Sequence, residues 1–317
     1  MYSREPTVPT TRNNTVNVWL KPNFFLLTLA LRPLLLAFSF WVKPFGNQEL
    51  IVSERLNFGM SNRSTWSVSP LGLLPGGGTA AGFAYWFLHA NAWGYALAGS
   101  LALLQLLGLY LLAARWSNES LGEFFRGWIT GLNAGLNAWL VTYLFGHWIF
   151  GLVLGGVVSA SSVLMISRNP QFQMVLGWSN WLLPLSWPVN LPGALMMLAN
   201  LVFFPIGYLH PLFRPIRIHL VLDLPSGSIT CYGGLIRPIA GFSGLNMGNF
   251  IFINPGFEHL QRHEIGHLFS LAAMGGPFHY IGGVDEAMWQ KNYWEAYAEH
   301  LADSYSTPTA SVRSIWG

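Results

Sequence analysis

The stretch His263-Glu264-Ile265-Gly266-His267 combines residue types and a spacing that suit a metal site. Residues four apart project from one face of a helix at adjacent turns, so both imidazole rings can reach a single Zn²⁺ at about 2.0–2.1 Å. Glu264 is turned toward the open side of such an ion. There it can take a proton from metal-bound water while that water attacks a carbonyl, and then deliver the proton to the leaving amine. The alternative is a purely structural helix.

A catalytic zinc site needs a third protein ligand and an open fourth position. Cys231 is the single cysteine, so the ligands must be histidines and carboxylates. Glu299 and Asp303 share a helix face, which lets one bind the metal while the other accepts the N–H of a ligating histidine. We therefore predict Glu299 as the ligand and Asp303 behind a histidine, with Glu295, one turn earlier, as the alternative ligand. The candidate acids downstream of the motif are Asp285, Glu286, Glu295, Glu299 and Asp303.

His279 and Tyr280 lie between the motif and these acids and are candidate hydrogen-bond donors. In a hydrolase such donors stabilise the oxyanion that develops on the substrate carbonyl. A lone His-Tyr pair in a loop is more often part of the packing, so this role is the weaker of the two interpretations.

The elements that must position these residues follow a change of pattern after Pro215. The stretch IRIHLVLDLPSGSITCYGG contains two β-prone runs around a Pro-Ser-Gly turn, which predicts a hairpin. A third strand is predicted over 249–254, a helix over 257–274 that ends at Gly275 and Gly276, and a second helix over 294–305. The motif therefore follows a short apolar strand, and the acids follow on another helix.

With these elements in place, HEIGH and the downstream E-x-x-A-D resemble the gluzincin group of zinc metallopeptidases over residues 249–305. The resemblance implies two histidines and one glutamate on zinc, with Glu264 as the catalytic base. It also implies that strand 249–254 is an edge that can pair with an extended peptide. The longer pattern is similar to uncharacterised bacterial membrane proteins with a C-terminal HExxH domain.

The composition predicts a membrane protein. Charged residues make up 9% of the 317 residues and hydrophobic residues 52%, against roughly 25% charged residues in soluble proteins. Apolar runs long enough to cross a bilayer predict about four spanning helices. These runs are 24–42, 95–114, 134–160 and 193–213. Within the third run, Gly151 and Gly155 have a small-xxx-small spacing that lets a neighbouring helix approach closely.

The distribution of charge predicts two domains. Residues 24–215 hold twelve charged residues, whereas eight of the thirteen acids and six of the nine histidines lie beyond residue 216. We therefore predict an α-helical multi-pass membrane region over 1–215 and a small α+β zincin-like metallopeptidase domain over 216–317. The partners expected are the lipid bilayer and a peptide or protein substrate. The sixteen lysines and arginines form no cluster, so nucleic-acid binding is not expected.

Orientation follows from the lysines and arginines that flank the four predicted spans. Seven fall on the side of the N-terminus and four on the other side, which favours a cytoplasmic C-terminal domain. With the bacterial resemblance, this predicts an integral protein of the inner membrane.

The function predicted is therefore a membrane-anchored zinc metallopeptidase that hydrolyses peptide bonds. One alternative is a non-catalytic membrane scaffold whose metal site is structural or degenerate. A less favoured alternative is an intramembrane metalloprotease of the site-2 type. That family needs an aspartate ligand in a later membrane segment, and none of the fifty residues after His267 form a span.

Overall fold

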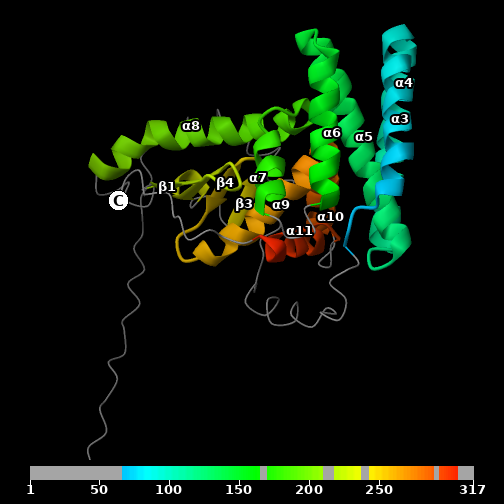
Figure 1. The fold of residues 1–317 in the computed structure, drawn as a ribbon. Coiled ribbons are helices and arrows are strands. Elements are labelled where there is room, and N and C mark those ends of the chain that lie inside the picture. Colours follow the sequence, from blue (N-terminus) through cyan, green and yellow to red (C-terminus); the bar gives the residue numbers. More distant parts are fainter. Residues whose placement is uncertain (1–65, 165–169, 210–217, 237–242, 289–292, 306–317) are drawn as a thin grey trace, which may run out of the picture. The chain divides into compact units, whose positions relative to one another are not determined.

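The computed structural model describes residues 66–164, 170–209, 218–236, 243–288 and 293–305 (Figure 1). All of them belong to one compact unit, Pro44–Gly317, so described residues on both sides of position 215 share it. The predicted span 24–42 lies outside the described residues. The described part is mostly helical and contains a small mixed sheet of four strands.

The first half of the described chain is a series of helices. Two of them, α3 and α5, lie so close that a Cβ on Gly72 would meet the carbonyl oxygen of Phe124 at 2.1 Å, and one on Gly76 would meet that of Trp128 at 2.2 Å. The helices are α3 (Pro70–His89), α4 (Ala92–Arg115), α5 (Ser120–Phe145), α6 (Trp148–Leu164), α7 (Pro170–Ser179) and α8 (Trp187–Leu209).

The predicted third span, 134–160, is wrong as a single helix. α5 ends at Gly146, whose φ of 72° is left-handed, and α6 begins two residues later. α6 returns antiparallel along α5, because Gly151 lies against Ala138 and Gly155 lies against Ala134. A Cβ on Gly151 would meet the carbonyl oxygen of Ala138 at 2.3 Å, which confirms the close approach predicted from the glycine spacing.

By length and composition, two helical stretches in the described part are apolar enough to cross a membrane, Trp93–Arg115 and Pro184–Phe203. The first coincides with the predicted span 95–114. Its leucines are exposed along the helix, as at Leu97, Leu104 and Leu111. The second covers much of α8 and overlaps the predicted span 193–213, but α8 packs on the sheet.

The sheet has the strand order β1-β2-β4-β3. The predicted hairpin is confirmed: β1 (Ile218–Asp223) pairs antiparallel with β2 (Ser228–Gly233), with His219 opposite Tyr232. β4 (Phe250–Ile253) pairs parallel with β2 and antiparallel with β3 (Gly244–Met247). The strand predicted over 249–254 is therefore an inner strand. The edge next to it is β3, which the sequence did not reveal.

Helices cover both faces of this sheet (Figure 1). On one face, Asn190 of α8 accepts a hydrogen bond from the backbone N–H of Asn249, and Gly193 lies against Phe250. Because side chains alternate along a strand, Ile251 and Ile253 point to the opposite face. There they join the buried cluster that contains Ile265, Leu268 and Phe269 of the next helix.

That next helix is α9 (Gln261–Met274), which follows the short turn η5 (Glu258–Leu260) and ends at Gly275. The helix predicted over 257–274 is thus confirmed, as is the one predicted over 294–305, which is α11 (Tyr293–Ser304). Between them lies α10 (Gly276–Met288), a helix that the Gly-rich sequence did not predict.

Two buried asparagines on α5 attach α9 to the preceding helices. Nδ2 of Asn133 donates to the carbonyl oxygens of Ala272 and Ala273 at 2.9 and 3.2 Å. Its Oδ1 accepts from Nδ2 of Asn137, whose own Oδ1 accepts from the N–H of Leu185. The repeated sequence GLNAGLNA thus places two amides one turn apart. Asn133 satisfies backbone carbonyls at the end of α9, and Asn137 satisfies the N–H of Leu185 before α8.

Candidate metal centre

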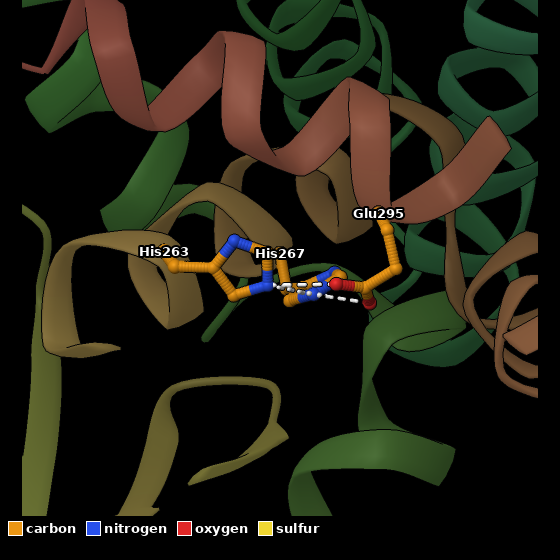
Figure 2. A group of neighbouring side chains, drawn as sticks. All are labelled: His263, His267 and Glu295. Carbon is orange, nitrogen blue, oxygen red and sulfur yellow. Dashed lines mark hydrogen bonds and ion pairs between the residues drawn. The ribbon is translucent and has the colours of Figure 1, made fainter. Parts of the chain in front are cut away.

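Three side chains converge between α9 and α11: His263, His267 and Glu295 (Figure 2). The Nε2 atoms of the two histidines are 3.1 Å apart. Oε2 of Glu295 lies 2.9 Å from Nε2 of His263, and Oε1 lies 3.0 Å from Nε2 of His267. The two histidines project from one face of α9, as their four-residue spacing predicts.

The separations between these atoms fit a metal ion. Ligands at about 2.0–2.1 Å from a tetrahedral zinc lie about 3.3 Å from one another. The two Nε2 atoms are 3.1 Å apart, and each carboxylate oxygen of Glu295 lies 2.9 or 3.0 Å from one of them. One ligand atom from each residue lies within 4.8 Å of the other two. Two imidazole nitrogens and one carboxylate are also a donor set that zinc prefers, and three protein ligands leave one position open. The cluster is therefore compatible with a catalytic type of zinc site.

Glu299, the predicted third ligand, lies on the other side of His263. Its Oε2 is 3.0 Å from Nδ1, while Nε2 of the same ring faces Glu295. The Glu299 side chain is 63% exposed, against 16% for Glu295. A carboxylate at Nδ1 orients the ring and leaves Nε2 available for a metal. The geometry therefore favours the alternative, Glu295, as ligand and gives Glu299 the supporting place predicted for Asp303.

Asp303 is exposed and is not part of the cluster. Its backbone carbonyl accepts from Nη2 of Arg262 at 2.9 Å, and Nε of Arg262 donates to the carbonyl of Ala302 at 2.7 Å. These bonds satisfy carbonyl groups at the end of α11. Arg262, which directly precedes the motif and which the sequence did not single out, thus attaches α11 to α9.

The variable residue Gly266 of the motif allows α9 and α11 to cross closely. A Cβ on Gly266 would lie 2.0 Å from the carbonyl oxygen of Ala298, closer than real atoms approach. Ala298 lies between Glu295 and Glu299 on α11. The contact therefore sets the distance from which both carboxylates reach the histidines.

A Gly266→Ala variant is expected to lower the free energy of unfolding by about 1–3 kcal/mol, because overpacking must push the two helices apart. The same shift should move Glu295 away from the two histidines and so lower the affinity of this cluster for a metal ion such as Zn²⁺. Thermal unfolding of the detergent-solubilised protein, with zinc content measured in parallel, checks both effects. Gly108→Ala on α4 is the control, because its added Cβ meets nothing within 4 Å. Equal losses in the two variants would contradict the role given to Gly266.

Electrostatics within the cluster favour a charged carboxylate. Burial alone would raise the pKa of Glu295, but the rings of His267 and His263 outweigh it and hold that pKa well below its usual range. Burial likewise opposes the charge on His263, yet Glu295 and Glu299 raise its pKa well above the usual value. The carboxylates thus concentrate negative potential at the two Nε2 atoms, which suits a cation.

Glu264 lies beside the cluster and is almost completely buried. Burial raises the pKa of its carboxyl group, partly offset by His263 and His267. A raised pKa suits a general base that must also return its proton near neutral pH. Its carboxylate lies against Gly244 of β3, where a Cβ would meet Oε1 at 2.4 Å. Asn246 of β3 donates to the backbone carbonyl of Glu264 at 2.8 Å.

The two predicted oxyanion donors are placed differently. The hydroxyl of Tyr280 donates to the carbonyl of Pro188 on α8 at 2.7 Å, which does not favour a role at the metal centre. His279 packs edge-on against the ring of Trp294, which in turn stacks on His267. Burial, followed by the proximity of His267, lowers the pKa of His279 to about 3. His279 is therefore neutral, and its ring packs against the rings of His267 and Trp294.

Searches against protein-family models, curated proteins and solved structures find no match to this chain.

Proposed function

We propose that the protein is a membrane-anchored zinc metallopeptidase with a zincin-like domain of the gluzincin type over residues 216–317. The observation that carries the proposal is the convergence of His263, His267 and Glu295 within 4.8 Å, beside a buried Glu264. In this proposal the three residues hold Zn²⁺ and Glu264 is the catalytic base. Glu299 acts as a positioning residue through Nδ1 of His263.

The chemistry divides between the ion and the chain. When bound, zinc would act as a Lewis acid and would lower the pKa of a bound water to about 7. Glu264 accepts a proton from the attacking water and transfers it to the nitrogen of the leaving amine. The new C–O bond forms first, and the peptide C–N bond breaks as the leaving nitrogen receives the proton. Burial of Glu264 keeps its carboxylate desolvated.

An extended peptide has a place to bind in this proposal. β3 is an edge of the sheet, and Gly244 and Leu245 are partly exposed, next to Glu264. Backbone groups on an edge strand can pair with an added strand. The edge role that the resemblance implies for strand 249–254 is thereby transferred to β3.

The position of the third carboxylate favours this proposal over a site-2-type intramembrane protease. Such an enzyme takes its aspartate from a later membrane segment, whereas Glu295 lies on α11. α11 has twelve residues and is not among the two candidate spans of the described part. Placement in a bacterial inner membrane with a cytoplasmic C-terminal domain stays a prediction.

The proposal is tested with the full-length protein, purified in detergent, stripped of metal and titrated with Zn²⁺. We expect one zinc per chain and cleavage of a peptide library only after zinc is added. His263→Ala should lose both properties, while His259→Ala, an exposed histidine on η5, should keep both. Stoichiometric zinc without cleavage of any peptide would instead favour the membrane scaffold with a structural metal. No zinc binding would reject both.

A further inference from the structure

Helix α8 has its polar and apolar faces reversed relative to a helix of a soluble protein. Its buried side carries Asn190, Gly193, Met197 and Asn200. The leucines on its other side are exposed: Leu191 by 62%, Leu195 by 67% and Leu198 by 57%. No Asp, Glu, Lys or Arg occurs between positions 169 and 213. A helix that turns its amides inward and its leucines outward is suited to an apolar surrounding medium.

The buried face of α8 is hydrogen-bonded to the sheet layer at two points along the helix. Near its start, Asn190 accepts from the N–H of Asn249 at 2.8 Å and donates to the carbonyl of Asn180 at 3.1 Å. Three turns later, Asn200 accepts from the N–H of Leu235 at 2.7 Å. Leu235 belongs to η4 (Gly234–Ile236), directly after β2. Both ends of this contact are therefore fixed to the sheet layer.

This attachment excludes α8 as a helix that crosses the bilayer. If it crossed, the sheet beside it would have to lie within the hydrocarbon layer. Among the described residues, β1 carries Asp223, and α9, which packs on the sheet, carries Arg262 and Glu264. Ionisable side chains are costly within hydrocarbon, so the layer that carries them belongs outside it. A lipid-facing α8 must therefore lie parallel to the membrane surface.

Neighbouring residues extend the same apolar surface. Trp178 and Met174 on α7 and Leu182 in the following turn are exposed. The indole N–H groups of Trp178 and Trp181 donate to the carbonyls of Leu224 and Gly227. Tryptophans with an apolar ring and a satisfied N–H are typical of membrane interfaces. Figure 1 shows that α8 runs crosswise to α4, the other candidate span.

We propose that α8 is an in-plane membrane helix, with Leu191, Leu195 and Leu198 inserted in the lipid surface and the sheet on the aqueous side. The inference rests on the membrane anchoring in the proposed function, but it does not depend on zinc or on hydrolysis. Helices of this kind insert their apolar face about 5–10 Å into the boundary between headgroups and acyl chains. The metal centre then lies on the far side of the sheet from the lipid, which points to substrate segments outside the bilayer.

The experiment measures depth in phosphatidylcholine vesicles that contain the full-length protein. Cys231 is replaced by alanine, and single cysteines at positions 191, 195, 198 and 201 of α8 carry a nitroxide label. Power saturation with oxygen and a water-soluble nickel complex gives each label's depth. Positions 191 and 201 are about 15 Å apart along the helix. We expect their depths to agree within a few ångströms, whereas labels at 97 and 111 of α4 should differ by up to about 21 Å.

Each other outcome overturns the inference in a distinct way. A progressive depth change of about 15 Å between positions 191 and 201 would show that α8 crosses the bilayer. Labels on α8 shielded from both reagents, with spin–spin coupling between labels at 191 on two molecules, would show a second copy of the chain on this face. Shielding without coupling would show that another segment of the same chain covers it. If labels on α4 also lie outside the lipid, the membrane anchoring in the proposed function fails as well.

Discussion

A Glu264→Gln variant is expected to lose about 10²–10⁴-fold in kcat for peptide hydrolysis, which is the usual contribution of a general base. Its zinc content should stay that of the wild-type protein, because Glu264 is not among the three converging ligand atoms. Glutamine has nearly the same shape and occupies the same buried position against Gly244. It cannot accept the proton of the attacking water.

The measurement combines zinc analysis with turnover of the best peptide found for the wild-type protein. Glu119→Gln, an exposed acid before α5, is the matched control and should change neither quantity. Gly266→Ala, with its shifted helices, provides a contrast in which stability and zinc fall together. An active Glu264→Gln enzyme would rule out Glu264 as the base and would require another group to accept the proton.

The second large effect distinguishes the two glutamates of α11. Glu295→Gln should raise the zinc Kd by about a thousand-fold, since a total binding free energy of about 10–16 kcal/mol is shared among few ligands. Glu299→Gln should raise it by only about 10–100-fold, as expected for a carboxylate that orients a ligating histidine. Asp303→Asn should leave it unchanged, because Asp303 is exposed and is not part of the cluster.

Competition with a fluorescent chelator measures these three constants on the same scale. The order Glu295, Glu299, Asp303 follows from the contacts around His263. A larger loss for Glu299→Gln than for Glu295→Gln would restore the ligand that the sequence favoured.

The sequence was sufficient to bring the two histidines and the buried glutamate onto one helix, because this arrangement depends only on local periodicity. Local sequence did not decide which acid of α11 approaches the two histidines, because that depends on how α11 packs against α9. Glu295, Glu299 and Asp303 follow one another at four-residue intervals on a single face. The point where α11 crosses α9, at Gly266 and Ala298, decides which acid reaches Nε2. The glycine was visible in the motif, but its partner on α11 was not.

The same distinction holds for the fold: some elements follow from local sequence signals, and others depend on contacts between residues far apart in the chain. The Pro-Ser-Gly turn predicted the β1–β2 hairpin, and Gly275 and Gly276 predicted the end of α9. β3 contains Gly, Leu, Asn and Met, a composition with little strand preference, and its pairing with β4 stabilises it. The run 134–160 contains no Asp, Glu, Lys or Arg, so its hydropathy did not reveal the reversal at Gly146.

Asn133 on α5 ties the candidate metal centre after residue 215 to the helices before it. Severing the polypeptide after residue 215 would remove the amide that satisfies the carbonyls of Ala272 and Ala273, five and six residues after the motif. Buried acceptors without donors cost about 1–3 kcal/mol each. Any detergent or lipid that loosens α5 is therefore expected to disturb the His263, His267 and Glu295 cluster as well, so the affinity of that cluster for a metal should depend on the solubilising medium.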